Sequence, residues 1–425
     1  MHLTYPEWLP YLLNSLLGFL GQLMGKQWYI NWAPEFLLIV LAVILFTMVA
    51  IVAQAAVIFM VLMERKVLAW MTQRKGPNRV GPWGLLQTLA DGVKLLFKED
   101  VMHRDQDKLL FTLGPAIFFI PCFVLFAFIP FTDEMVGLLI PAGALLVFAL
   151  SSISVVGLVI SGWASNSKYS LLGGMRSAAQ AISYEIPLVL AVLGVVLASG
   201  TLNIKHIVDA QFGPFWNWYA IALTPVSFAI FFIASIAEVN RIPFDLPEAE
   251  SELVSGYNTE YSGMKFALFF LAEYASLFAM SGLTVAFFFG GYHSPLGFFV
   301  TPGLFEGNQS LAWLMMQVEM LFWFLAKTYV FIFIAMWWRA TLPRLKPDQL
   351  MGFSWKFLIP LSLINIFVLA IGKYMLLTIN APFSIMPAAS TWLTWAVFAV
   401  LCFWGFFTLA SNIFMQKIEA RLANR

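Results

Sequence analysis

Long apolar runs alternate with shorter polar segments along the chain. A helix of roughly 20 apolar residues spans the ~30 Å hydrocarbon core of a bilayer. Nine runs are of about that length: 36–62, 109–129, 135–161, 178–199, 219–237, 266–290, 313–337, 357–379 and 393–414. The fourth is unbroken only from Ile186, and extending it back to Ala178 places Glu185 inside the membrane. The pattern predicts an all-α integral membrane protein with about nine transmembrane helices.

The lysine and arginine residues predict the orientation, because cytoplasmic loops retain positive charge. Of 24 such residues, 20 fall in the first, third, fifth and seventh loops and in the C-terminal tail. We therefore expect the N-terminus outside and the C-terminus in the cytoplasm, in a bacterial inner membrane. The stretch Leu9–Met24 is apolar but has no basic region before it and no small-residue cleavage site. We expect it to lie on the outer surface, and a tenth, short span is the alternative.

Composition agrees with the apolar runs and limits the chemistry. The chain is 61% hydrophobic and 11% charged, against about 25% charged in soluble domains. Its two cysteines, Cys122 and Cys402, lie in predicted spans without a partner at ligand spacing, and its four histidines lie in loops or at a terminus. These positions suit neither an iron–sulfur cluster, nor zinc, nor a membrane haem. We expect no redox cofactor, metal or nucleic acid on this chain.

Three of the ionisable residues within predicted spans stand out as candidates for function. Glu185 and Glu273 each lie about seven residues into a span, roughly 10 Å below the inner surface. Lys327 lies twelve residues before Arg339, about 18 Å away and so near mid-membrane. Charged groups at such depth are costly and commonly functional. We interpret them as candidate proton relays, and structural ion pairing that only fixes helix packing is the alternative.

Two inner loops carry unusual patterns. From Trp83 to Lys98 apolar residues fall at helical spacing, which predicts an amphipathic helix in the interface plane. Its simplest role is lipid anchoring. The fifth loop is acidic on an otherwise basic side, with Glu238, Asp245, Glu248, Glu250, Glu252 and Glu260 against Arg241 and Lys265. A solvated charge run is one interpretation, and a proton-collecting or partner-docking surface is the other.

Four segments resemble inner loops of the H-subunit family of respiratory complex I, the NADH-quinone oxidoreductase; the mitochondrial homologue is known as subunit 1. Their sequences are ERKVLAWMTQRKGPNRVGPWGLLQTLADGVKLLFKE, GWASNSKYSLLGGMRSAAQAISYE, AEVNRIPFDLPEAESELVSGYNTEYSGMKFALFFLAEYA and, after Lys327, WRATLPRLKPDQLMGFSWK. The resemblance spans most of the chain. It implies a family core over 35–385 with eight spans, preceded by an outer-surface segment, 1–34, and followed by an additional helix and tail, 386–425.

The resemblance also implies a function. In that family the inner loops wall a quinone chamber where the membrane arm meets the hydrophilic arm of a proton-translocating NADH-quinone oxidoreductase. By this match the quinone site takes Arg65, Arg74, Asp91, Arg176 and Phe244. The proton path takes Glu64, Glu185, Glu238, Glu248, Glu252, Glu260 and Glu273, and Lys327 matches a basic residue of the family. Quinone is the expected substrate, and partner subunits of both arms are expected to hold flavin and iron–sulfur clusters.

Other functions stay open on the sequence alone. Related subunits serve membrane-bound hydrogenases and other donor-linked dehydrogenases. Buried acids and a mid-membrane lysine also suit a proton-coupled secondary transporter. The loop motifs do not repeat between the two halves of the chain, which disfavours a transporter built from internal repeats. A structural anchor without a site of its own is the third alternative.

Overall fold

A computed structural model describes residues 56–247, 250–299 and 309–378. Six helices in this part are long and apolar enough to cross a membrane: Lys108–Phe128, Gly143–Ala164, Lys168–Ser199, Gly263–Phe288, Leu311–Thr341 and Pro347–Tyr374. They match six predicted spans, and the prediction of a multi-pass helical membrane protein is confirmed. The predicted span 393–414 and most of 36–62 lie outside the described residues, as does the segment 1–34.

The helices follow one another through the described part of the chain. After a helix over 56–71 come η1 (Pro82–Gly84), α3 (Gln87–Phe97), α4 (Lys108–Val124), η2 (Leu125–Phe128), α5 (Gly143–Ala164), α6 (Lys168–Ser199), α7 (Ile204–Asp209), η3 (Phe215–Asn217), α8 (Tyr219–Ala222), α9 (Pro225–Glu238), α10 (Glu250–Leu253), η4 (Gly256–Asn258), α11 (Gly263–Phe288), α13 (Gln309–Thr341), α14 (Pro347–Phe353), the π-helical η5 (Ser354–Leu358) and α15 (Ile359–Thr378).

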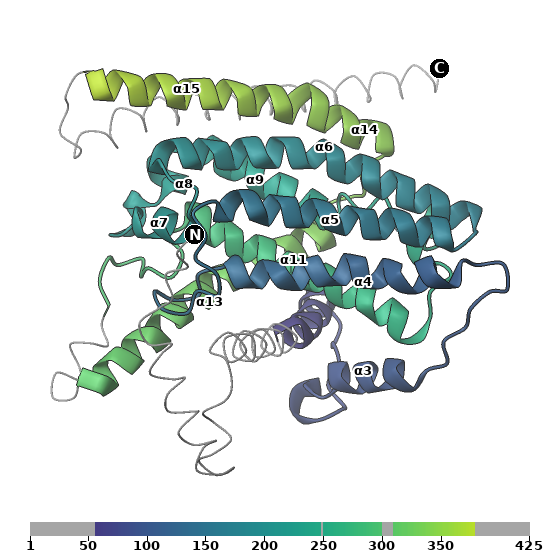
Figure 1. The fold of residues 1–425 in the computed structure, drawn as a ribbon. Coiled ribbons are helices and arrows are strands. Elements are labelled where there is room, and N and C mark those ends of the chain that lie inside the picture. Colours follow the sequence, from purple (N-terminus) through teal and green to yellow (C-terminus); the bar gives the residue numbers. More distant parts are fainter. Residues whose placement is uncertain (1–55, 248–249, 300–308, 379–425) are drawn as a thin grey trace, which may run out of the picture.

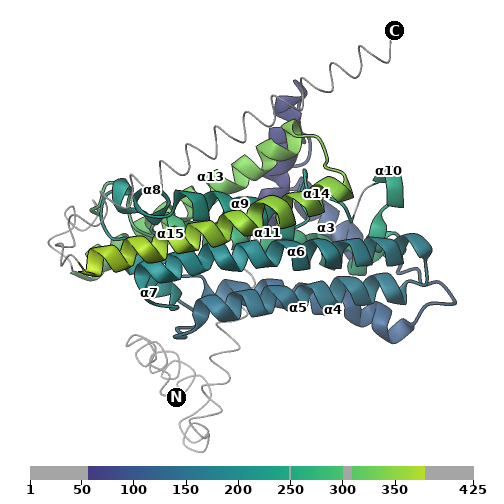
Figure 2. The same ribbon diagram turned by 90° about the horizontal axis from the view of Figure 1, so that it is seen from above.

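The long helices α4, α5, α6 and α15 lie side by side (Figure 1), and α13 crosses them at an angle (Figure 2). α11 runs through the interior, where it packs on α4, α9 and α13. α4 and α5 approach closely because α5 presents Gly157 to α4. A Cβ added there would lie 2.5 Å from the backbone nitrogen of Phe118. In lipid there is no hydrophobic driving force for helices to associate. Small residues stabilise the contact between two helices there because they allow close van der Waals packing.

The predicted span 219–237 is not one continuous helix, and this prediction was wrong in that respect. α8 ends at Ala222, and the 14-residue α9 begins at Pro225. Thr224 between them has φ −132° and ψ 51°, outside the helical region. Pro225 has no N–H to donate, so it suits the first turn of a helix and interrupts a longer one. The apolar run alone does not reveal this break.

The predicted amphipathic helix is confirmed, with a later start than Trp83. Trp83 lies in the 3₁₀ turn η1 with φ 57°, and α3 begins at Gln87. The apolar side chains Leu89, Leu96 and Phe97 are exposed, Phe97 by 87%. α3 lies apart from the stacked long helices and contacts α11 (Figure 1). This arrangement suits the expected place in the interface plane.

Candidate functional site

Four charged side chains from distant parts of the chain form a buried cluster. Arg241 Nη1 lies 2.9 Å from Glu64 Oε2, and Arg241 Nε lies 3.0 Å from Glu273 Oε1. Arg339 pairs with the other carboxylate oxygen of Glu64. The Arg241 guanidinium also lies 4.1 Å from the ring centre of Tyr274. The side chains of Arg241, Glu64 and Glu273 are only 6%, 3% and 16% exposed, so this charge cluster is held in the interior.

Each member of the charge cluster comes from a different element. Glu64 lies on the helix over 56–71, Glu273 on α11 and Arg339 in the last turn of α13. Arg241 lies in the loop after α9, where Asn240 has a φ of 55° and turns the chain. Two carboxylates and two guanidiniums balance in charge. Since a buried ion pair that loses one partner leaves an uncompensated charge, these four helices and loops depend on one another.

Two further ion pairs join helices that carry predicted site residues. Arg65 Nη1 lies 2.6 Å from Asp91 Oδ2, which joins the helix over 56–71 to α3. Arg176 Nη1 lies 2.6 Å from Glu252 Oε2, which joins α6 to α10. These pairs are partly exposed, so each contributes little to stability. They do hold the side chains of Arg65 and Arg176 in defined positions.

The remaining predicted quinone-site residues lie in two different settings. Arg74 lines a shallow hollow of about 420 Å³, together with Lys66, Trp70, Lys75 and Pro77. Phe244 is buried, with its ring centre 5.6 Å from that of Tyr184. Of the three predicted arginines Arg65, Arg74 and Arg176, Arg74 alone is among the residues that line the hollow, and the backbone of Arg65 lies beside Gly76, which also lines it.

The side chain of Gln180 holds the loop that carries Phe244. Its Nε2 donates to the carbonyl oxygens of Ala237 and Phe244, both at 2.7 Å. Ala237 lies in the last turn of α9 and Phe244 in the loop that follows. One buried amide on α6 therefore satisfies two backbone acceptors, and it fixes the loop that contains Arg241.

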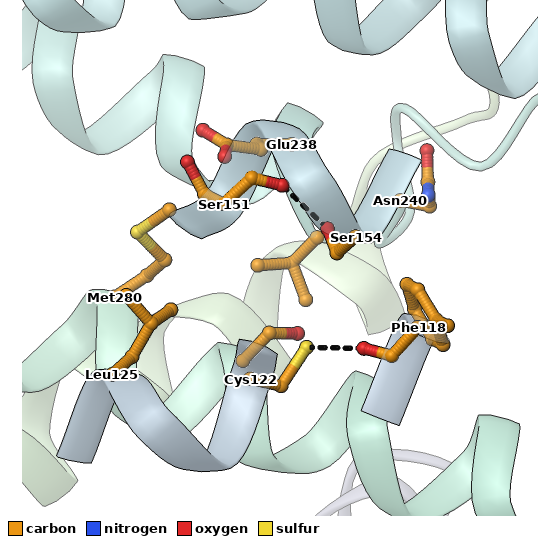
Figure 3. Close-up of a pocket in the computed structure, with 10 residues that line it drawn as sticks. Phe118, Cys122, Leu125, Ser151, Ser154, Glu238, Asn240 and Met280 are labelled. Atoms are coloured by element: carbon orange, nitrogen blue, oxygen red, sulfur yellow. Dashed lines mark hydrogen bonds between the residues drawn. The ribbon is translucent and has the colours of Figure 1, made fainter. Parts of the chain in front are cut away.

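Two acids of the predicted proton path, Glu185 and Glu238, lie beside serines of α5. Ser152 Oγ donates to Glu185 Oε1. Glu238, the last residue of α9, lines a cavity of about 30 Å³ whose wall includes Ser151 and Ser154 (Figure 3). The predicted acids Glu252 and Glu260 lie nearer the surface, exposed and half-buried respectively. Glu248 lies outside the described residues.

Lys327 lies apart from the glutamates. Its Nζ donates to the carbonyl oxygens of Phe289 and His293, at 2.8 and 2.9 Å, and lies 4.7 Å from the ring centre of Trp218. Phe289 is the C-cap of α11, sixteen residues beyond Glu273, which is about 24 Å along the helix. The ammonium meets the negative end of the α11 dipole. A role for Lys327 in a proton path stays a prediction.

A buried histidine lies beside Lys327. His293 Nε2 is 3.9 Å from Asp209 Oδ1, and Asp209 accepts a hydrogen bond from the Tyr292 hydroxyl. Burial and the nearby Lys327 ammonium lower the pKa of His293 to about 4. His293 is therefore neutral at pH 7.

Sequence reasoning misses the central members of the charge cluster. It interprets Arg241 only as a counter-charge of the acidic loop, and Arg339 only as a marker of the inner surface. The signal for Arg241 is its place as one of two cations among six acids, since a cation so surrounded is expected to be paired. The serines of α5 carry a weaker signal, three hydroxyls at 151, 152 and 154 within an apolar run.

Fold and site together define a multi-pass helical membrane protein with buried charges gathered beside its loops. Residues 39–370 match the family model described as NADH dehydrogenase. The chain is 48% identical to the H subunit of NADH-quinone oxidoreductase from Brevibacillus brevis, over 80% of this chain and 94% of that protein. It is 49% identical to the H subunit from a Geobacillus species, over 75% and 89%, and 45% identical to that from Dehalococcoides mccartyi, over 78% and 86%. The chain belongs to this NADH dehydrogenase family, among the H subunits of NADH-quinone oxidoreductase.

Proposed function

We propose that this chain is the membrane subunit of a proton-translocating NADH-quinone oxidoreductase that walls the quinone chamber and begins the proton path. The observation that carries the proposal is the buried charge cluster of Glu64, Arg241, Glu273 and Arg339. Glu64 is followed directly by Arg65, which pairs with Asp91, and a further ion pair holds Arg176. A protein that only anchors others to the membrane has no need of interior carboxylates, which are costly to bury.

The proposed quinone site consists of Arg65, Arg74, Asp91, Arg176 and Phe244, as the family resemblance assigns them. Electrons come from the iron–sulfur and flavin groups of partner subunits, and this chain contributes no redox group. Two electrons arriving on a quinone head group create negative charge on its two oxygens. Guanidinium groups at the chamber wall stabilise that charge, and two protons complete the quinol. Phe244 lies behind the wall and shapes it, since its ring is buried against Tyr184.

The proposed proton path uses Glu64, Glu185, Glu238, Glu248, Glu252, Glu260 and Glu273, with Lys327 as a more distant member. Glu64 and Glu273 share Arg241, so a change of charge on one alters the field at the other. A proton that moves toward the quinone disturbs this balance, and the cluster responds by exchanging protons with its neighbours. The electrostatic coupling needs no large movement of the helices.

The topology belongs to the same proposal. We place nine spans across the cell inner membrane, the fifth of them broken between α8 and α9. The N-terminus is outside, the C-terminus is in the cytoplasm, and a ninth helix in 386–425 is added to a core over 35–385. On this arrangement the partners of the inner loops are the quinone-site and iron–sulfur subunits of the hydrophilic arm. Other membrane-arm subunits flank the long helices.

Photolabelling tests the quinone assignment. The intact complex is irradiated with a photoreactive quinone analogue, with and without excess quinone, and labelled peptides are mapped. We expect competed labelling of this chain in the loops around Arg65, Arg74 and Arg176. We expect Arg176→Gln to weaken it. Lys373→Gln should leave it unchanged, because Lys373 Nζ donates to Leu197 O near the other end of α6. Labelling confined to other subunits would remove the quinone site from this chain.

A further inference from the structure

A small cavity lies in the interior of the bundle, between α4, α5, α9 and α11 (Figure 3). Its volume is about 30 Å³, which is enough for one or two water molecules. The polar part of its wall comes from Glu238, Asn240, Ser151, Ser154 and Ser276, and the apolar part from Phe118, Cys122, Leu125, Val239 and Met280. Figure 3 shows Glu238 beside Ser151 on one side of the cavity and Cys122 on the opposite side.

The serine hydroxyls of this wall donate hydrogen bonds to backbone carbonyl oxygens. Ser151 Oγ donates to the carbonyl of Phe148 at 2.9 Å, and Ser154 Oγ donates to the carbonyl of Ser151 at 2.6 Å. On α11, Ser276 Oγ donates to the carbonyl of Glu273 at 2.9 Å. A hydroxyl has one hydrogen and two lone pairs. While these bonds are made, Ser154 and Ser276 can offer the cavity only an acceptor. Ser151 also lies within hydrogen-bonding reach of the Glu238 side chain.

Two further acceptors of the wall lack a partner. Glu238 Oε2 and Asn240 Oδ1 are buried, and neither accepts a hydrogen bond from any described residue. The Cys122 thiol donates to the carbonyl of Phe118 at 3.2 Å, so its hydrogen is also used. A buried acceptor without a donor is costly. An occupant that donates hydrogen bonds removes this cost, and the apolar half of the wall cannot supply one.

We propose that the cavity holds one or two water molecules, and that Ser151, Ser154 and Ser276 are positioning residues that orient this water toward Glu238. The inference rests on the proposed function of Glu238 in the proton path. Most polar groups around the water are acceptors, so the water points its hydrogens at the wall, including Glu238 Oε2. When an excess proton reaches the water, a different O–H bond of that water breaks as the bond to Glu238 Oε2 forms. The water is regenerated and Glu238 becomes neutral.

A matched pair of variants at Ser154 tests the inference. Val and Thr have the same shape, so Ser154→Val and Ser154→Thr add equal bulk, but only Thr keeps a hydroxyl oxygen. In the purified complex reconstituted in sealed liposomes, we expect Ser154→Val to lower NADH-driven proton pumping about tenfold relative to Ser154→Thr. We also expect a larger kinetic solvent isotope effect in Ser154→Val. Equal pumping and equal isotope effects in the two variants would overturn the proposal.

Two controls separate this inference from the proposed function. Ser235, on α9, is buried and donates to Phe232 O at 2.9 Å, but it does not line the cavity, so Ser235→Val and Ser235→Thr should pump equally. Glu238→Gln tests the path itself. If Glu238→Gln stops pumping while Ser154→Val does not, only the water inference fails. If Glu238→Gln pumps normally, the place of Glu238 in the path fails. Should neither Ser154 variant assemble, Ser154→Ala removes the oxygen without added bulk. It should also pump less than wild type, and wild-type pumping by it would overturn the proposal.

Discussion

The buried charge cluster makes a prediction about stability that follows from its geometry. Arg241→Gln removes the cation that contacts both carboxylates and leaves only Arg339, whose side chain is 35% exposed, against Glu64. Two buried carboxylates then face one guanidinium. Removing one partner of a buried ion pair costs about 3–5 kcal/mol, so we expect a loss of that size in the stability of the assembled subunit.

A double-mutant cycle with Glu273→Gln tests whether lost charge balance is the cause of the instability of Arg241→Gln. Glu273→Gln alone removes one of the two anions and leaves Arg241 paired with Glu64. We expect a smaller loss from Glu273→Gln, because the excess positive charge then falls partly on Arg339, whose side chain is 35% exposed to solvent. When both substitutions are combined, Glu64 keeps Arg339 and the cluster is again balanced. The double variant should therefore be more stable than Arg241→Gln by about 1–3 kcal/mol.

Irreversible unfolding is expected for a membrane complex, so the assay is a rate. Purified complexes are heated, and the loss of NADH-quinone reductase activity and of this subunit from the complex is followed over time. We expect Arg241→Gln to be lost fastest and the double variant at an intermediate rate. Arg104→Gln, at an exposed loop position, is the control and should behave as wild type. If the double variant loses as much as the two single variants added together, the charge-balance reasoning is refuted.

Three further predictions concern separate parts of the molecule. Asp91→Asn should change stability by less than about 1 kcal/mol, because its pair with Arg65 is partly exposed, but should raise the KM for quinone in steady-state assays. An unchanged KM would separate Asp91 from the chamber. The lowered pKa of His293, about 4 against roughly 6.5 unfolded, means that the unfolded chain binds the extra proton between these values. The contribution of His293 to stability is therefore lost as the pH falls from 6.5 to 4, and inactivation rates at pH 7 and pH 5 should differ less in His293→Gln; equal pH dependence would contradict this. Gly157→Leu should prevent assembly, measured as subunit recovered in the complex, because a Cβ there already meets the Phe118 backbone at 2.5 Å; normal recovery would contradict the close packing of α4 and α5.

Sequence patterns predict the long helices well, for a physical reason. In lipid every backbone group has to be satisfied within the segment, so a long apolar run has to be helical. The break before Pro225 is missed because Thr224 and Pro225 interrupt the apolar run only briefly, although a proline within a helical pattern is itself a signal for a break. The start of α3 also shifts, since Trp83 is held in a turn that hydrophobic spacing does not encode.

The candidate site is predictable only in part. Glu64, Glu185 and Glu273 are marked by charge within apolar surroundings or by family resemblance. Their partners depend on tertiary packing: Arg241 and Glu64 are 177 residues apart in the chain. Counting from Arg339 places Lys327 near mid-membrane, whereas its contacts put it at the end of α11. Distance along one helix does not reveal which end of a neighbouring helix a side chain meets.

The most direct test of the central claim is the proton pumping of variants at the buried glutamates. NADH-driven acidification and quinone reduction are measured together in sealed proteoliposomes containing the complex with Glu185→Gln or Glu273→Gln. Glu134→Gln, at a half-buried loop carboxylate that accepts a hydrogen bond from Trp313, is the matched control. We expect both interior variants to lose most of their proton pumping while Glu134→Gln keeps it. Full pumping by Glu185→Gln and Glu273→Gln would contradict the claim that these carboxylates carry the coupling.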